Sequence, residues 1–192
     1  MIRQLSYFAL LTVFTFTLLG CFEEDNNTPL GVPYEPTRDQ LEAGPEPGKS
    51  FLQWNATGLQ RGEAHGYEVT MVCYHGIATD IVIPDMLGLE VEATSLAEDS
   101  LECTIEVSDT IFTQTEYLPE GITWADSVAY WVDSTVVQWP VGVTDGHEIS
   151  FYWYNRNTGA MIQVQTDYNE SRWVAKTLHF SRYVLGQKRT GS

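Results

Sequence analysis

The chain has 192 residues, which is the size of one ordinary domain with a terminal extension, so two large domains are not expected. Hydrophobic residues make up 43% of the sequence and aromatic residues 12%, which is enough to build a packed core and excludes wholesale disorder. The chain has 10 Lys and Arg against 26 Asp and Glu, and the net charge of -16 should repel nucleic-acid backbones, so no nucleic-acid partner is expected.

Residues 1–20 have the pattern of an export signal. Arg3 supplies a positive start, and residues 7–19 form an apolar run that is too short for a comfortable membrane span but long enough for the core of a signal peptide. The run ends in Leu18, Leu19, Gly20 and Cys21. This string resembles the lipobox of bacterial lipoproteins. The resemblance implies cleavage before Cys21 and acylation of Cys21 with palmitate-like chains, which together anchor a protein stably. The alternatives are a plain signal peptide and an N-terminal membrane helix.

The lipobox resemblance also bears on location. Phe22 follows the cysteine, in place of the aspartate associated with retention in an inner membrane. The resemblance therefore implies an outer-membrane, lipid-anchored protein of the cell envelope, on either the periplasmic or the surface side. It covers about 21 residues, and the domain behind them resembles no family.

Residues 21–49 have the composition of an acidic, proline-rich tether. Glu23, Glu24 and Asp25 lead into a stretch that holds five of the eight prolines. Such a segment is expected to stay flexible and to span about 30 Å. A short helix at residues 37–43, capped by Thr37, is a weak possibility that the flanking prolines oppose.

The remainder reads as β-strands, because apolar residues recur with a period of two between clusters of Gly, Asn, Asp and Pro. Three alternating stretches stand out, at residues 67–73, 87–93 and 101–107. Further strands are expected at residues 80–83, 111–117, 128–132, 136–139, 148–154, 160–167 and 172–184. The last three of these are expected to form a meander. The predicted fold is an all-β antiparallel sandwich over residues 50–186, with a jelly roll as one fitting arrangement, followed by a basic tail at residues 187–192.

Two cysteines remain once Cys21 is assigned to the lipid. Cys73 and Cys103 lie on the apolar sides of their strands, and an exported protein meets an oxidising compartment. We therefore predict a Cys73–Cys103 disulfide, with two separate buried thiols as the alternative.

Charge is distributed unevenly along the chain. Residues 62–155 contain no Lys or Arg, whereas residues 151–192 contain six of them against two acidic residues. This pattern fits either a solvated acidic surface or a basic end that faces an anionic lipid, glycan or protein.

Candidate chemistry is sparse. The histidines have no metal-ligand spacing, so neither a metal nor a cofactor is predicted. Glu90 and Glu92 share a strand face at about 7 Å, a spacing that a glycosidase could use, and Glu102 and Glu106 share another at about 13 Å. No accompanying catalytic motif is present, and no catalytic residue is assigned.

Aromatic residues supply the candidate binding site. Residues 151–154 are all aromatic, so both faces of that strand carry rings, and one face could be exposed. The candidate patch consists of Tyr152, Tyr154, Trp173 and Tyr183. The alternative is that these rings belong to the core of the sandwich.

Together these features predict a lipid-anchored envelope protein that acts by binding, as an accessory subunit with a protein partner or as a glycan-binding module. An enzyme is not favoured. The alternative function is a jelly-roll enzyme that acts on polysaccharide through paired carboxylates.

Overall fold

The computed structural model describes residues 33, 35–56, 58–60 and 67–191. It is 50% strand and 11% helix, with antiparallel sheets packed together, which confirms the predicted all-β sandwich. In chain order the elements are α1 (Arg38–Ala43), β1 (Gln53–Trp54), β2 (Glu68–Tyr74), β3 (Thr79–Ile83), β4 (Leu87–Val91), β5 (Ser100–Val107), β6 (Thr115–Leu118), β7 (Thr123–Asp133), η1 (Ser134–Val136), β8 (Val137–Gln138), η2 (Gly146–Glu148), β9 (Ile149–Asn155), β10 (Ala160–Gln163), β11 (Thr166–Asn169), β12 (Arg172–His179) and β13 (Arg182–Gln187).

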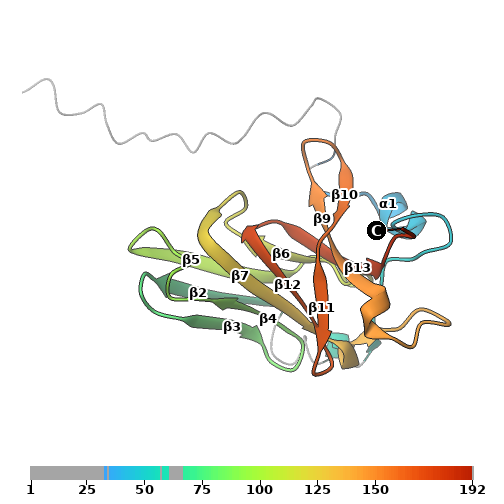
Figure 1. The fold of residues 1–192 in the computed structure, drawn as a ribbon, viewed down its shortest axis with the longest axis horizontal. Coiled ribbons are helices and arrows are strands. Elements are labelled where there is room, and N and C mark those ends of the chain that lie inside the picture. The colour runs from blue at the N-terminus through green and yellow to red at the C-terminus, as the bar shows by residue number, and fades with distance from the viewer. Residues whose placement is uncertain (1–32, 34, 57, 61–66, 192) are drawn as a thin grey trace, which may run out of the picture.

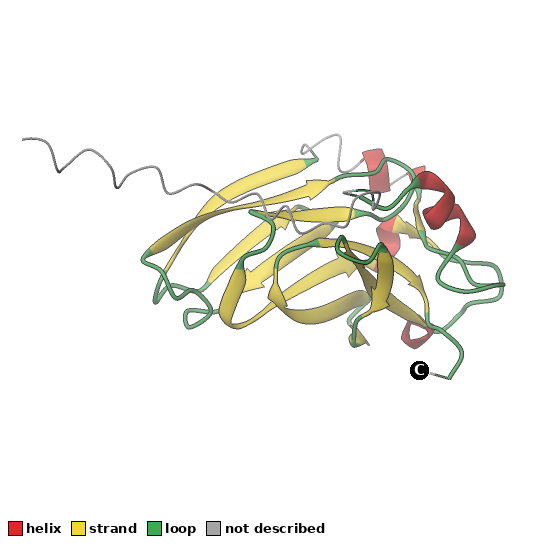
Figure 2. Cartoon of the chain, turned by 90° about the horizontal axis from the view of Figure 1, so that it is seen from above, coloured by secondary structure: helices red, strands yellow, loops and turns green. Residues whose placement is uncertain are grey.

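The sandwich has two main sheets. One has six strands in the order β10-β9-β13-β6-β5-β2, the other has five in the order β11-β12-β7-β4-β3, and β1 pairs with β8 in a small third sheet. Figure 1 shows the strands of both main sheets, and Figure 2 shows from above that the two sheets form layers, with the short helices gathered toward one end.

The inner faces of both main sheets form one apolar core, and strand alternation selects its members. Leu87, Leu89 and Val91 of β4 are buried, as expected, while Glu90 is exposed. Cys103, Ile105 and Val107 of β5 alternate with more exposed residues in the same way. On β2 the alternation holds less well, because this strand lies at the edge of its sheet: Cys73 is buried but Met71 is 40% exposed.

The expected meander at the end of the chain is wrong. Residues 160–167 divide into β10, which pairs with β9, and β11, which pairs with β12 in the other sheet. Residues 172–184 likewise cross between sheets, since β13 returns to pair with β9. Period-two alternation continues through these crossings and does not specify which sheet a strand joins. One crossing is held by Thr166, whose hydroxyl accepts a hydrogen bond from the Phe151 N–H at 2.9 Å.

The segment before the first strand packs on the outer face of the six-stranded sheet. The predicted helix forms as α1, and Thr37 caps it: the Gln40 N–H donates to the Thr37 hydroxyl at 3.3 Å, and the Thr37 N–H donates to the Gln40 side chain at 2.8 Å. Leu41 is 3% exposed and packs with Phe51, Tyr152 and other residues in a second small core.

This packing moves the boundaries of the domain. Pro36 and Pro45, assigned to the tether by composition, are buried, so residues 35–49 belong to the folded domain. The predicted basic tail is also held in place, because the Arg189 guanidinium donates to the carbonyl oxygens of Pro45 (3.1 Å) and Met161 (2.8 Å). A proline-rich, acidic composition therefore excludes neither the short helix α1 nor the docking of the segment onto the domain.

Candidate binding site

The four aromatic residues of the predicted patch are all buried. Tyr152, Tyr154, Trp173 and Tyr183 have exposed fractions of 0%, 3%, 0% and 1%. Trp173 and Tyr183 lie in the core between the sheets, whereas Tyr152 and Tyr154 lie on the outer face of β9, where the N-terminal segment covers them. A binding patch formed by these four side chains together is therefore wrong, because Trp173 and Tyr183 are buried between the sheets and Tyr152 and Tyr154 are buried beneath the N-terminal segment.

The least buried aromatic residue of β9 is Trp153. Its side chain is partly buried against the core, and its ring packs at an angle of 60° on the ring of His179, at the end of β12, with 4.9 Å between centroids. The sequence pointed to the aromatic strand but not to Trp153. Tyr152 and Tyr154 are covered by the N-terminal segment, which lies more than 100 positions earlier in the chain.

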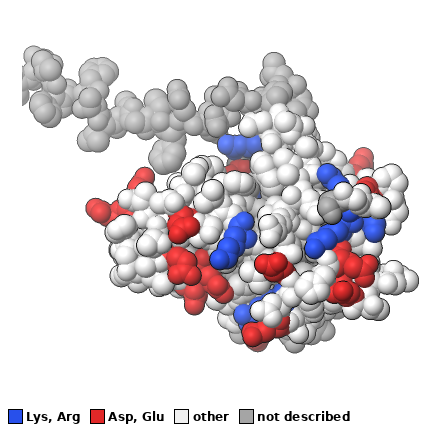
Figure 3. All heavy atoms as spheres, viewed as in Figure 1, with Lys and Arg blue, Asp and Glu red and all other residues white. Residues whose placement is uncertain are grey.

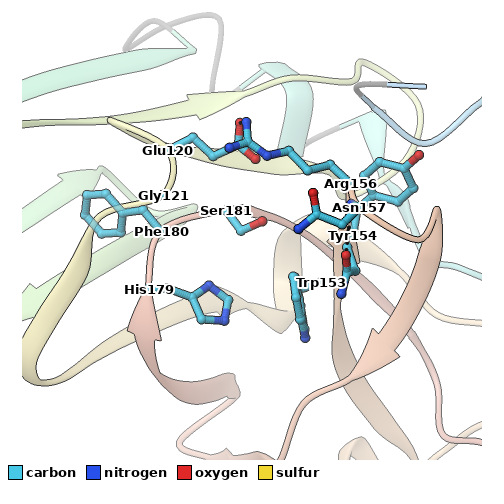
Figure 4. Close-up of a pocket in the computed structure, with 10 residues that line it drawn as sticks. Glu120, Gly121, Trp153, Tyr154, Arg156, Asn157, His179, Phe180 and Ser181 are labelled. Atoms are coloured by element: carbon cyan, nitrogen blue, oxygen red, sulfur yellow. Dashed lines mark hydrogen bonds and ion pairs between the residues drawn. The ribbon is translucent and has the colours of Figure 1, made fainter. Parts of the chain in front are cut away.

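Two surface hollows adjoin the Trp153–His179 ring pair. The first, shown in Figure 4, has a volume of about 200 Å³. Its polar lining residues are Glu120, Asn155, Arg156, Asn157 and Ser181. The second has a volume of about 370 Å³. Besides the two rings it is lined by Ser127, Gln163, Val164, Lys176, Thr177, Leu178 and Tyr183. Because Trp153 and His179 line both hollows, we treat the two as one site and call it the Trp153 groove.

Each hollow of the groove contains charged side chains. In the first hollow Arg156 and Glu120 form an ion pair of 3.3 Å, on the opposite side from the two rings (Figure 4). In the second hollow Lys176 is exposed. Burial lowers the pKa of His179, so its imidazole is uncharged at neutral pH and can both donate and accept a hydrogen bond. The two rings that both hollows share are therefore uncharged at neutral pH.

This arrangement suits a ligand with apolar faces and many hydroxyl groups. A partly exposed indole offers an apolar face, and the surrounding amides, hydroxyls and charged groups can fix the orientation of polar groups on a ligand. Pyranose rings have this character.

The predicted carboxylate pairs do not lie in this groove. Glu90 on β4, Glu92 just after β4 and Glu102 on β5 are all exposed. The structure instead brings Glu106 directly opposite Glu116 of β6 and Glu68 of β2, on the outer face of the six-stranded sheet. Burial, the Glu116 carboxylate and the Glu68 carboxylate, in that order, raise the pKa of Glu106.

Glu116 is itself held by an arginine. It is 7% exposed, and its carboxylate accepts from the Arg182 guanidinium at 2.9 Å. Arg182 also contacts Glu35 of the N-terminal segment at 3.0 Å. The pairing of Glu106 with Glu116 depends on strand register, so sequence spacing along a single strand could not reveal it.

The two cysteines lie together on the inner face of the six-stranded sheet. Cys73 is opposite Leu101 and Cys103 is opposite Met71, which makes the thiols diagonal neighbours on β2 and β5. Both are buried and both are free thiols in the structure. The nearby Cys73 thiol, and then burial, raise the pKa of Cys103. The disulfide stays a prediction.

Among the described residues, no group of three or more His, Cys, Asp or Glu side chains is placed to hold a metal ion. His75 is held by the Leu96 carbonyl oxygen, 2.6 Å from its Nδ1, and His65 lies outside the described residues.

The predicted signal peptide and Cys21 also lie outside the described residues. Within the part of the chain that the structure describes, no helix combines the length and apolar character needed to cross a membrane. No protein-family model matches the chain, and no curated protein shows significant similarity to it.

Proposed function

We propose that this chain is a lipid-anchored protein of the cell envelope that binds glycan in the Trp153 groove. The observation that carries the proposal is the Trp153–His179 ring pair, which lines two adjoining hollows whose other walls are rich in polar side chains. The lipobox resemblance at Cys21 supports the anchor, and outer membrane is the expected location because Phe22 follows the cysteine.

The position of Pro33 limits how far the Trp153 groove can lie from the lipid anchor at Cys21. Its carbonyl oxygen accepts a hydrogen bond from Tyr154, which lines the first hollow. Residues 21–32 can span at most about 40 Å when fully extended. The groove therefore stays near the membrane surface, where envelope polysaccharides and the sugar parts of glycolipids are available.

Binding is tested with the lipidated protein in detergent micelles, probed with bacterial polysaccharides and peptidoglycan fragments on an array. We expect at least one of these glycans to bind, and Trp153→Ala to weaken its binding by about tenfold or more, because the stacking face is lost. Trp153→Phe keeps a ring and should retain most of the affinity. Ile111→Ala, which alters an exposed apolar residue outside the groove, is the matched control. Glycan binding that is unchanged by Trp153→Ala would refute the groove as the site.

The anchor is tested separately. Cys21→Ser should move the protein from the detergent phase to the aqueous phase on phase partition and should abolish labelling with a palmitate analogue. A wild-type protein that carries no label would contradict the lipidation.

A second candidate function uses Glu106 and Glu116. A carboxyl group with a raised pKa beside an ion-paired carboxylate is an arrangement found in acid–base catalysis, so a polysaccharide-acting enzyme is the alternative. This alternative predicts that the wild-type protein hydrolyses a polysaccharide and that Glu106→Gln abolishes the activity. If the protein binds glycans without cleaving them, the alternative is rejected.

A further inference from the structure

A second surface lies at the other side of the six-stranded sheet, on the free edge of β2. The Val107 N–H donates to the Tyr67 carbonyl oxygen (2.9 Å), and the His75 N–H donates to that of Asp99 (3.0 Å). In an antiparallel pair, hydrogen-bonded positions alternate, so the odd-numbered residues of β2 bond to β5. The N–H and C=O groups of the even-numbered residues Glu68, Thr70, Val72 and Tyr74 therefore point away from the sheet.

Most of these outward groups are open in the described part of the chain. The Tyr74 carbonyl oxygen accepts from Ile77 in the following turn (3.1 Å), whereas the outward groups of Glu68, Thr70 and Val72 have no backbone partner among the described residues. An edge of this kind is a template for another strand.

The edge also exposes apolar side chains. Met71, Val72, Tyr74 and Ile77 are 40%, 39%, 52% and 56% exposed. They make up half of the large hydrophobic residues found exposed in the described chain. Edge strands are usually protected by charges, proline or bulges, but β2 has one charged residue, Glu68, at its start.

The charge around the edge identifies the kind of partner that fits. Strands β2 to β8 contain no Lys or Arg. Glu102 and Glu106 of β5 lie beside β2 on the outer face of the sheet. Figure 3 shows acidic atoms, and no basic ones, over the end of the sandwich where β2, β3 and β5 lie in Figure 1. A second copy of this chain would bring the same acidic surface to the edge, so the charge opposes it.

We propose that the free edge of β2 binds an extended, basic segment of a partner protein, which adds a seventh strand to the sheet. Side chains of the added strand alternate in register with β2. Those on the outer face would lie near Glu68, Glu102 and Glu106 and should be Lys or Arg, while those beside Met71 should be apolar. This site is separate from the Trp153 groove and does not depend on glycan binding.

The probe is a synthetic peptide of about eight residues that alternates lysine with valine, compared with a glutamate–valine peptide, in titrations against the lipidated protein. We expect the lysine peptide to bind, and to slow hydrogen exchange at the amides of Thr70 and Val72. The glutamate peptide should not bind.

Val72→Pro is the decisive variant. The Val72 N–H points away from β5, so a proline there leaves the sheet intact but removes a donor from the free edge. We expect the peptide affinity to fall about tenfold or more, while Val72→Thr, which keeps the N–H and the branched shape, binds nearly as wild type. Thermal unfolding of each variant checks that it is folded.

Three results would overturn the proposal. The first is equal binding of the lysine peptide to the wild type and to folded Val72→Pro. The second is binding of the lysine peptide without slower hydrogen exchange at the Thr70 and Val72 amides. Either result would mean that the peptide binds only by general attraction between charges. The third is protection of these amides without peptide, increasing with protein concentration, which would identify a second copy as the occupant. If Val72→Pro does not fold, the exchange experiment on the wild-type protein decides alone.

Discussion

The hydroxyl of Tyr154 donates a hydrogen bond of 2.8 Å to the carbonyl oxygen of Pro33, 121 positions earlier in the sequence. This bond, together with the burial of Leu41, closes the N-terminal segment over the outer face of β9. It explains why Tyr152 and Tyr154, two of the four aromatic residues predicted for binding, are covered. Trp153 points to the opposite face of β9 and is partly buried there.

The docking of the N-terminal segment predicts the effect of Leu41→Ala. Removing this 3% exposed side chain from the second core should lower the free energy of unfolding by about 2–4 kcal/mol. Urea denaturation measures the change. Glu42→Ala, on the exposed side of the same helix, should change it by less than about 0.5 kcal/mol. Equal effects of the two substitutions would mean that the segment is a loose tether.

Gly88 makes room for Trp131. A Cβ at Gly88 would lie 2.7 Å from the indole of Trp131, whose ring also packs against the Arg172 guanidinium at 4.0 Å. Gly88→Ala should therefore lower the free energy of unfolding by about 1–3 kcal/mol. Thermal unfolding of a double-mutant cycle with Trp131→Leu checks the cause, because the cost should shrink when the indole is absent. If Gly88→Ala lowered the free energy of unfolding equally with and without the Trp131 indole, the strain would not come from the contact with Trp131.

The cysteine pair predicts a difference between oxidised and reduced protein. Protein isolated from its envelope should be lighter by two hydrogens than the reduced form, and reduction should lower the free energy of unfolding by about 3–4 kcal/mol, since the bond closes a loop of roughly 30 residues. Mass spectrometry and denaturation measure the two quantities. In the Cys73→Ala/Cys103→Ala variant, reduction should have no effect. Two titratable thiols in the native protein would reject the bond.

His179 predicts part of the dependence of stability on pH. Burial lowers the pKa of His179 in the folded state, so between its folded and unfolded pKa values the unfolded chain binds more protons. Its contribution to stability is present above the unfolded pKa, near 6.5, and is lost as pH falls through the folded pKa. His179→Gln should therefore lose less stability than the wild type on acidification from pH 7.5 to 5. If the stability of the wild type and of His179→Gln fell equally with pH, the imidazole of His179 would not be desolvated in the folded state.

Glu106 predicts an effect of opposite sign. Its pKa is raised in the folded state, first by burial and then by Glu116 and Glu68, so ionisation at neutral pH costs stability. Glu106→Gln should raise the melting temperature at pH 7, and the gain should vanish below about pH 4.5, where the unfolded carboxyl is also protonated. Glu102→Gln, an exposed change on the same strand, is the control.

Several features followed from the sequence because they depend on short-range patterns. Alternation along residues 87–93 and 101–107 selected most of the buried residues, since side chains of a strand point to opposite faces wherever the strand lies. Leu101 and Ala93 are only partly buried, and Gly88 is buried against the pattern. The Thr37 cap of α1 was also readable, because capping involves residues three positions apart. The fold class followed from repetition of the strand pattern along the chain.

Other features depended on contacts between distant segments, and the tertiary structure alone decided them. The alternation of apolar and polar residues did not predict that β10 and β11 join different sheets. It also did not predict which face of β9 the N-terminal segment covers. The Trp153–His179 pair, the Glu106–Glu116 pair and the free edge of β2 all arise from strand order and register. Register is set by packing of the whole sandwich, so a strand's own residues determine which side chains share a face but not which neighbours they meet.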